Sequence, residues 1–154
     1  MTPPDAGEHA SRPRVSAVQG PRRLRTAGLG PDLRTSERLP NNNLPLELTS
    51  FIGRGREVAE VKGLVGDNRL LTLTGPGGCG KTRLALAVAF EVASSFEDGV
   101  WWVGLASISG PDLVPQMVAQ VLEVREQPHL ALTETLADSL HEKQLLLVLE
   151  TAST

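Results

Sequence analysis

The stretch at residues 75–82, which reads GPGGCGKT, constrains the fold of this 154-residue chain more than any other feature. It matches the pattern G-x-x-x-x-G-K-[ST], in which glycines let backbone amides turn inward and approach an anion closely. The pattern requires a strand before it and a helix after it. RLLTLT at residues 69–74 predicts a short strand, and RLALAVAFEVA at residues 83–93 is apolar nearly all round, as in a helix packed against a sheet. The stretch is therefore predicted to bind the phosphates of a nucleotide.

Two side chains of this stretch have their own predicted roles. Lys81 would place its ammonium against the β and γ phosphates. Thr82 would offer its hydroxyl to Mg²⁺ in the first turn of the helix, whose positive end also faces the anion. The alternative is a glycine-rich turn without a ligand, but such a turn has no need of these two residues. The predicted phosphate-binding residues are Gly75, Pro76, Gly77, Gly78, Cys79, Gly80, Lys81 and Thr82.

The rest of the sequence alternates between strands and helices. Continuous apolar runs at residues 100–105 and 145–149 predict buried strands. Apolar residues at helical spacing predict helices at about residues 57–65, from residue 112 onward and at residues 133–141. Trp101 and Trp102 are adjacent in a strand and so point to opposite faces, which favours packing over stacking on a base. The alternation predicts an α/β fold with a parallel sheet and flanking helices.

The first forty residues differ in composition from the rest. Pro, Arg, Ala and Gly make up 21 of them without apolar periodicity, and such a segment cannot bury enough surface to offset its ordering entropy. The basic run at residues 12–25 could contact nucleic-acid phosphates, but without interleaved aromatic residues a solvated linker is the preferred interpretation. GC-rich DNA read out of frame would yield the same mixture. Residues 1–43 are predicted to be a disordered tail or linker, and residues 44–154 the folded part.

Composition also limits the compartment and the chemistry. Cys79 is the single cysteine, so an internal disulfide is excluded. The start lacks an apolar signal segment, and no apolar run approaches the roughly 20 residues of a membrane helix. A cytoplasmic protein is therefore expected.

Four stretches together resemble the nucleotide-binding domain of bacterial signal-transduction ATPases of the STAND class, which includes LuxR-type and antibiotic-regulator-type transcription factors. The stretches are NNLPLELTSFIGRGREV, LLTLTGPGGCGKTRLALAVA, VWWVGLASI and LADSLHEKQLLLVLE. The resemblance covers about residues 42–150 and implies a P-loop NTPase-type parallel sheet that binds ATP with Mg²⁺, although the residues themselves do not exclude GTP. It also implies that Phe51, Ile52 and Gly53 lie near the base. Glu150, where the family has Asp, would help to hold Mg²⁺ and to support catalysis.

The end of the sequence departs from the family. Relatives read LLLVLDNCEHL where this chain reads LLLVLETAST, and deleting one base from GAC AAC TGC GAG CAC yields Glu-Thr-Ala-Ser. A single-base frameshift is therefore the hypothesis for this ending, and residues 44–154 would be the N-terminal portion of the domain. The strand at residues 69–74 would then keep unpaired backbone groups, because the strands that flank it in the family are not encoded.

Three functions are consistent with this sequence. The preferred one is an ATP-binding module of a signalling or transcriptional regulator, whose nucleotide state switches DNA-binding or oligomerisation domains outside this chain. The alternatives are a stand-alone ATP-hydrolysing or phosphoryl-transfer enzyme and an inactive truncated product. The first two differ in whether further acids and an arginine lie beyond Glu150, so slow or absent turnover is expected of this chain.

Overall fold

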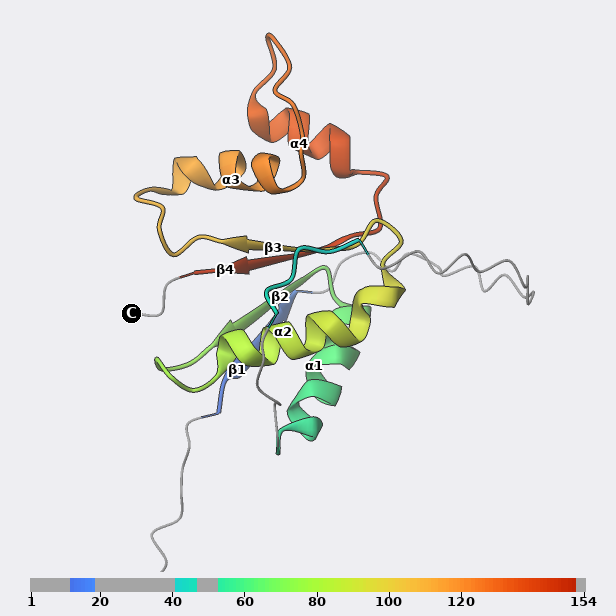
Figure 1. Ribbon diagram of the computed structural model, residues 1–154, viewed down its shortest axis with the longest axis vertical. Helices are drawn as coiled ribbons and strands as arrows, with labels where there is room; N and C mark the ends of the chain where they lie inside the picture. The colour runs from blue at the N-terminus through green and yellow to red at the C-terminus, as the bar shows by residue number, and fades with distance from the viewer. Residues whose placement is uncertain (1–11, 19–40, 47–52, 152–154) are drawn as a thin grey trace, which may run out of the picture.

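The computed structural model describes residues 12–18, 41–46 and 53–151, which form a mixed α/β architecture (Figure 1). The strands are β1 (Arg14–Val18), β2 (Leu70–Thr74), β3 (Val100–Gly104) and β4 (Leu146–Glu150). The α-helices are α1 (Gly55–Asp67), α2 (Lys81–Val92), α3 (Val114–Val121) and α4 (Leu132–Leu140). Two short 3-10 helices, η1 (Ala93–Ser95) and η2 (Pro111–Leu113), follow α2 and precede α3.

β3 and β4 form a small parallel sheet that lies between two layers of helices. Their register runs from Val100 opposite Leu146 to Gly104 opposite Glu150. Figure 1 shows α3 and α4 on one face of this pair and α2 on the other. Val103 packs with α3 and α4, whereas Val100 and Trp102 pack with α2. The two faces therefore alternate along β3, as a strand buried on both sides requires.

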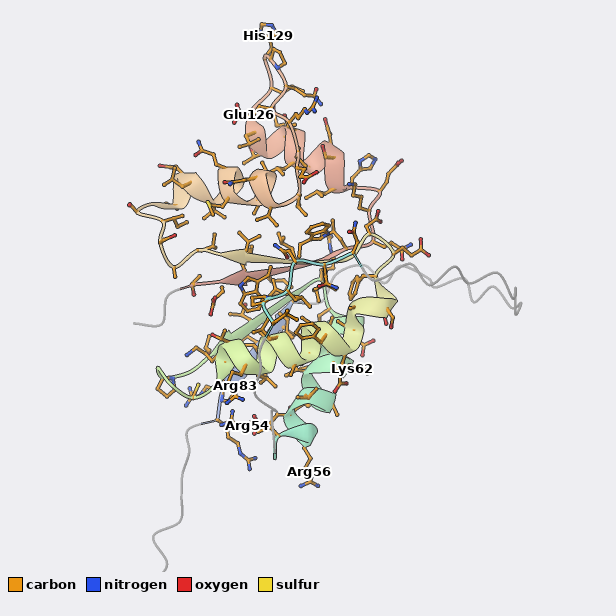
Figure 2. All side chains as sticks on the ribbon, viewed as in Figure 1. Arg54, Arg56, Lys62, Arg83, Glu126 and His129 are labelled. Atoms are coloured by element: carbon orange, nitrogen blue, oxygen red, sulfur yellow. The ribbon has the colours of Figure 1, made fainter. Side chains whose placement is uncertain are left out.

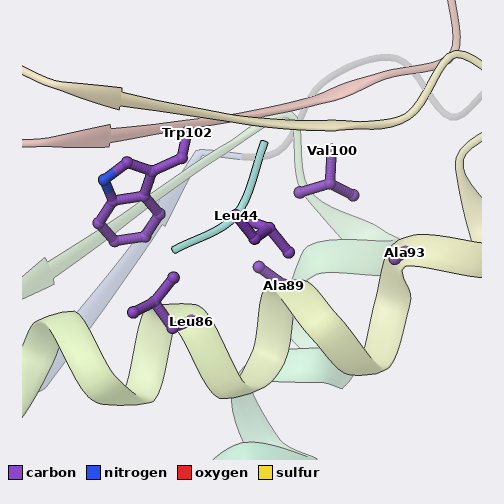
Figure 3. Close-up of a cluster of buried hydrophobic side chains, with 6 residues drawn as sticks. All are labelled: Leu44, Leu86, Ala89, Ala93, Val100 and Trp102. Atoms are coloured by element: carbon purple, nitrogen blue, oxygen red, sulfur yellow. The ribbon is translucent and has the colours of Figure 1, made fainter. Parts of the chain in front are cut away.

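The core between β3 and α2 also takes in the segment 41–46 (Figure 3). Leu44, only 7% exposed, packs with Leu86 and Ala89 of α2 and with Trp102. Asn43 fixes this segment to β3, because its side chain accepts a hydrogen bond from the Trp102 amide at 2.6 Å and donates one to the Trp102 carbonyl at 2.9 Å. The prediction that Trp102 serves packing is confirmed.

β1 lies within residues 1–43, the part of the chain predicted to be a disordered tail or linker. Arg14–Val18 pairs antiparallel with β2, from Arg14 opposite Thr74 to Val18 opposite Leu70. Val15 faces inward and packs with Val58 and Val61 of α1. This pairing does not depend on composition, because an open strand edge offers backbone hydrogen bonds to any segment that can extend along it. Outside residues 12–18 and 41–43, the predicted tail lies beyond the described residues.

β1 also provides β2 with a strand partner that the sequence did not predict. The family resemblance predicts that β2 does not pair with β4, and within the described residues it does not. One edge of β2 is paired with β1. The inner face of the β1–β2 ribbon carries Leu71 and Leu73, which pack against the cluster that α1 and α2 share. One edge of β2 therefore has a strand partner, whereas its other edge pairs with no strand within the described residues.

Helix boundaries differ from the sequence expectations by one or two residues, and α1 shows why. The sequence predicted a helix at about residues 57–65, whereas α1 runs from Gly55 to Asp67 and is capped by Asn68. Both the backbone amide and the side-chain amide of Asn68 donate to the Leu64 carbonyl, at 3.0 and 2.8 Å. Asn68 thus satisfies a carbonyl that the last turn leaves without an intrahelical donor.

Among the helices that the structure describes, none is long and apolar enough to cross a membrane.

Candidate phosphate-binding site

The predicted phosphate-binding stretch forms the loop between β2 and the first turn of α2. Gly78 and Gly80 have φ values of +77° and +86°, which side chains other than glycine rarely adopt. Gly80 is also the N-cap residue of α2. Gly75, Pro76, Gly77 and Gly78 are exposed. The glycines therefore give the loop a shape that leaves its backbone open to a ligand.

Lys81 folds back over the start of this loop. Its Nζ donates to the carbonyl of Gly75 at 2.8 Å and to that of Pro76 at 2.9 Å. The Nζ also makes a long contact of 4.0 Å to the Sγ of Cys79. The ammonium is thus held at the loop by neutral acceptors, close to the exposed glycines.

The amino end of α2 adds a second source of positive potential. The amide of Leu84 donates to the Gly80 carbonyl at 2.9 Å. The amides of Lys81 and Thr82 come earlier in the first turn, where helix geometry provides no carbonyl one turn before them. Amides in this position carry the partial positive charge of the helix dipole. An anion held at the loop would meet these groups directly.

Thr82 and Glu150, both predicted as metal ligands, are in direct contact. The Thr82 hydroxyl donates to Glu150 Oε1 at 2.7 Å, although 68 residues separate the two. Glu150 is the last residue of β4, and its carbonyl accepts the Leu105 amide at 2.7 Å, which fixes the end of the strand. β4 therefore delivers its terminal acid to the first turn of α2.

The oxygen atoms gathered here fit Mg²⁺ in kind. A hydroxyl and a carboxylate are ligands that Mg²⁺ accepts, usually together with water and substrate phosphates. Among the described residues there is no cluster of three or more His, Cys, Asp or Glu side chains that could hold a metal by itself. A metal at this place would need the oxygen atoms of a bound phosphate in addition to Thr82 and Glu150.

Cys79 lies under the loop rather than on its open side. Its side chain is 8% exposed, and a Cβ added to Gly75 would come within 3.0 Å of its Sγ. The Cys79 amide makes a long hydrogen bond of 3.4 Å to the Pro76 carbonyl. The Cys79 thiol is therefore buried against the loop, and its backbone amide and carbonyl contact the Pro76 carbonyl and Arg54.

The segment predicted to lie near the base is only partly described. Phe51 and Ile52 lie outside the described residues. Gly53 is exposed, in a turn with φ +92°, and a Cβ added to it would meet nothing within 4 Å. Gly53 precedes Arg54, and it is Arg54 that contacts the loop.

Arg54 is a site residue that the sequence reasoning missed. Its Nη1 donates to the Cys79 carbonyl at 2.8 Å and lies 3.5 Å from Glu57 Oε2. Arg12 Nε lies 3.8 Å from the other carboxylate oxygen of Glu57. The only sequence signal was the position of Arg54 directly before a predicted helix, which does not indicate what the side chain contacts.

Comparisons with known proteins match this chain to one family. Residues 56–151 match the NB-ARC domain. The chain is 41% identical over 103 residues to "Uncharacterized protein Rv0894" of Mycobacterium tuberculosis, a match that covers 67% of this chain and 26% of that protein. It is 36% identical over 90 residues to "Putative HTH-type transcriptional regulator Rv0890c" of the same organism, covering 58% of this chain and 10% of that protein. The matched part is thus about a quarter, or less, of the length of these curated relatives, and no solved structure matches the chain.

Proposed function

The chain belongs to the NB-ARC family of STAND-class NTPases, and from this premise we propose that it is an ATP-binding switch module of a signalling or transcriptional regulator. The observation that carries the proposal is the meeting of three features at one loop. They are the Lys81 ammonium, the amino end of α2 and the Thr82–Glu150 contact. Each of them suits one part of a nucleotide's phosphate chain with its metal.

In the proposed complex the loop at residues 75–82 holds the phosphates. The exposed glycines present backbone amides, and Lys81 exchanges its neutral carbonyl partners for anionic oxygen atoms. Hydrogen bonds between charged partners are roughly twice as strong as neutral ones, so this exchange favours binding. Phe51, Ile52 and Gly53 are proposed to lie near the base, and residues 44–154, joined by β1, to make up the nucleotide-binding part.

Thr82 and Glu150 are proposed to hold Mg²⁺ beside the phosphates. When bound, the metal would neutralise phosphate charge and orient the terminal phosphoryl group. Thr82 contributes its hydroxyl, and Glu150 a carboxylate that reaches the metal directly or through a water molecule. Among the described residues Glu150 is the acid that contacts Thr82. No group of three or more His, Cys, Asp or Glu side chains that could hold a metal is found among these residues, which favours binding of a nucleotide over its rapid hydrolysis.

As a switch, the module would act on other domains of the regulator. The relative named as an HTH-type transcriptional regulator points to a DNA-binding domain as the kind of partner. The nucleotide state of the loop would bias how that partner, or a further copy of the protein, is held. Direct nucleic-acid binding by the chain itself is not part of the proposal.

The test is nucleotide binding by the full chain, measured by isothermal titration calorimetry with ATP and Mg²⁺. Lys81→Ala removes the ammonium at the loop and is expected to weaken ATP binding by about 100-fold, because it removes a charge-assisted contact. Lys62→Ala is the matched control, since Lys62 is an exposed lysine on α1 that pairs with Glu91 at 3.1 Å (Figure 2).

Lys62→Ala should leave the ATP affinity within about twofold of wild type, because exposed ion pairs contribute little. Equal ATP affinities for wild type and Lys81→Ala, or no binding by the wild type, would refute the proposal. A parallel titration with GTP decides which nucleotide is preferred.

A further inference from the structure

Arg54 lies directly against Cys79 and Gly80 of the phosphate-binding loop. Its Nη1 donates to the Cys79 carbonyl at 2.8 Å, across 25 residues of sequence. The same Nη1 lies 3.2 Å from the position that a Cβ on Gly80 would occupy. The guanidinium therefore packs against the peptide unit that joins Cys79 to Gly80.

Two features hold Arg54 in this place. Arg54 is the N-cap residue of α1, and its own carbonyl accepts the Val58 amide at 3.1 Å, so its backbone is fixed to the start of that helix. Its side chain is paired with Glu57 at 3.5 Å. Both side chains are only about a quarter exposed, at 25% and 21%, so solvent and salt screen this pair less than a surface pair.

The orientation of the Cys79–Gly80 peptide matters for an anion. In a trans peptide the carbonyl and the following amide lie in one plane and point in opposite directions. When Arg54 holds the Cys79 carbonyl, the Gly80 amide must point away from the guanidinium. Gly80 adopts a φ of +86° and has no side chain to resist rotation of this peptide. Without Arg54, the carbonyl could turn toward the ligand and repel a phosphate.

We propose that Arg54 is a positioning residue for the phosphate-binding loop, which holds the Cys79–Gly80 peptide in the orientation that presents an amide to a phosphate. The inference rests on the proposed function, because it assigns Arg54 a part in nucleotide binding. It concerns the shape of the loop before any nucleotide arrives, so it can be tested without one.

The buried thiol of Cys79 is the probe. It is the single cysteine of the chain and is 8% exposed, so alkylation by a maleimide requires the loop to open. In the nucleotide-free full chain, Arg54→Ala and Arg54→Gln are expected to be labelled about tenfold faster than wild type, because each loses a hydrogen bond from a charged donor. Arg54→Lys retains a charged donor and should restore much of the protection.

Arg56→Ala is the matched control. Arg56 is an exposed arginine two residues further along, and in Figure 2 it extends from α1 away from α2. Its labelling rate should stay within about twofold of wild type. If Arg54→Ala does not fold, as judged by circular dichroism, Arg54→Gln takes its place in the comparison.

The second measurement is the ATP affinity of the same variants. Arg54→Ala should bind ATP about tenfold more weakly than wild type, and Arg54→Lys should recover part of the loss. Unchanged labelling of the Arg54 variants overturns the inference. If labelling is unchanged while ATP binding falls, Arg54 contacts the nucleotide instead. If the wild type fails to bind ATP, the proposed function fails, whereas the labelling rates still decide what Arg54 does to the loop.

Discussion

Thr82 and Glu150 show how much a single contact at this site depends on chain folding. The hydroxyl of Thr82 is the donor and a carboxylate oxygen of Glu150 the acceptor, at 2.7 Å in a partly buried place. A hydrogen bond to a charged group is among the stronger ones in a protein, at about 1.5–3 kcal/mol. Loss of the donor would leave the carboxylate partly buried without this partner.

Thr82→Val keeps the shape of the side chain and removes its hydroxyl. We expect the free energy of unfolding to fall by about 1–2 kcal/mol, because Glu150 loses its donor, and we expect Mg²⁺ to stop enhancing ATP binding. Urea unfolding and calorimetry with and without Mg²⁺ measure the two effects. Thr82→Ser keeps a hydroxyl and should resemble wild type in both, so a Ser variant as impaired as the Val variant would argue against this role.

A pair of glycines gives a second prediction at this scale. Gly80→Ala places a Cβ at φ +86° and 3.2 Å from Arg54, so we expect a loss of about 1–2 kcal/mol in the free energy of unfolding. Gly66→Ala lies within α1 and meets nothing within 4 Å, so we expect a gain of about 0.5–1 kcal/mol. Urea unfolding should give effects of opposite sign, and a stabilised Gly80→Ala would contradict the positive φ.

At the scale of elements, the β1–β2 ribbon shows what periodicity can and cannot reveal. The alternation in β2 indicates an inner face with Leu71 and Leu73, and the structure buries this face in part. Nothing in the composition of residues 14–18 indicated a strand, because strand pairing uses backbone groups that every residue has. Pro13, directly before β1, also approaches the glycine-rich loop, since its Cα lies 3.3 Å from a Cβ added to Gly75.

Two neighbouring substitutions test whether β1 has this register. Val15→Asp introduces a charge on the inner face, against the cluster with Val58 and Val61, and should lower the free energy of unfolding by about 2 kcal/mol. Ser16→Asp introduces the same group on the exposed face and should change it by less than about 0.5 kcal/mol. Urea unfolding of the full chain distinguishes them, and equal effects would show that β1 does not pair as described.

At the scale of the whole molecule, α2 connects the two sheets. Leu86, Ala89 and Ala93 lie in the cluster with β3, which Figure 3 shows. Leu84, Val88 and Val92 lie in the cluster with α1 and the β1–β2 ribbon. A helix that is apolar on two sides is expected between two layers, and the sequence predicted this property for residues 83–93. We expect the described parts to unfold together, because α2 belongs to both clusters.

Leu84→Ala tests this coupling. Leu84 is 1% exposed, so the cavity should lower the free energy of unfolding by about 2–5 kcal/mol. Leu130→Ala makes the same chemical change at a residue that is 45% exposed and should lower it by less than about 1 kcal/mol.

Tryptophan fluorescence reports β3, and circular dichroism reports the helices. Both transitions should shift together in urea for Leu84→Ala. A shift in circular dichroism alone would show that the two clusters unfold independently.

The sequence by itself determined the local features of this protein. The glycine-rich loop, the order of strands and helices from α1 to β4 and the apolar faces of α1 and α2 were all predicted, because each depends on residue types at short, regular spacing. The membership of the chain in a nucleotide-binding family was predicted from the same short stretches and confirmed by the NB-ARC match.

The tertiary structure alone decided which distant groups meet at the site. Three contacts join residues that no periodicity connects. They are the hydrogen bond from Arg54 to the Cys79 carbonyl, the pairing of β1 with β2 and the 2.7 Å hydrogen bond from Thr82 to Glu150. Backbone edges carry no side-chain signature, and a side chain's partner depends on how whole elements pack. For that physical reason the glycine-rich loop could be predicted from the sequence, whereas its contact with Arg54 could not.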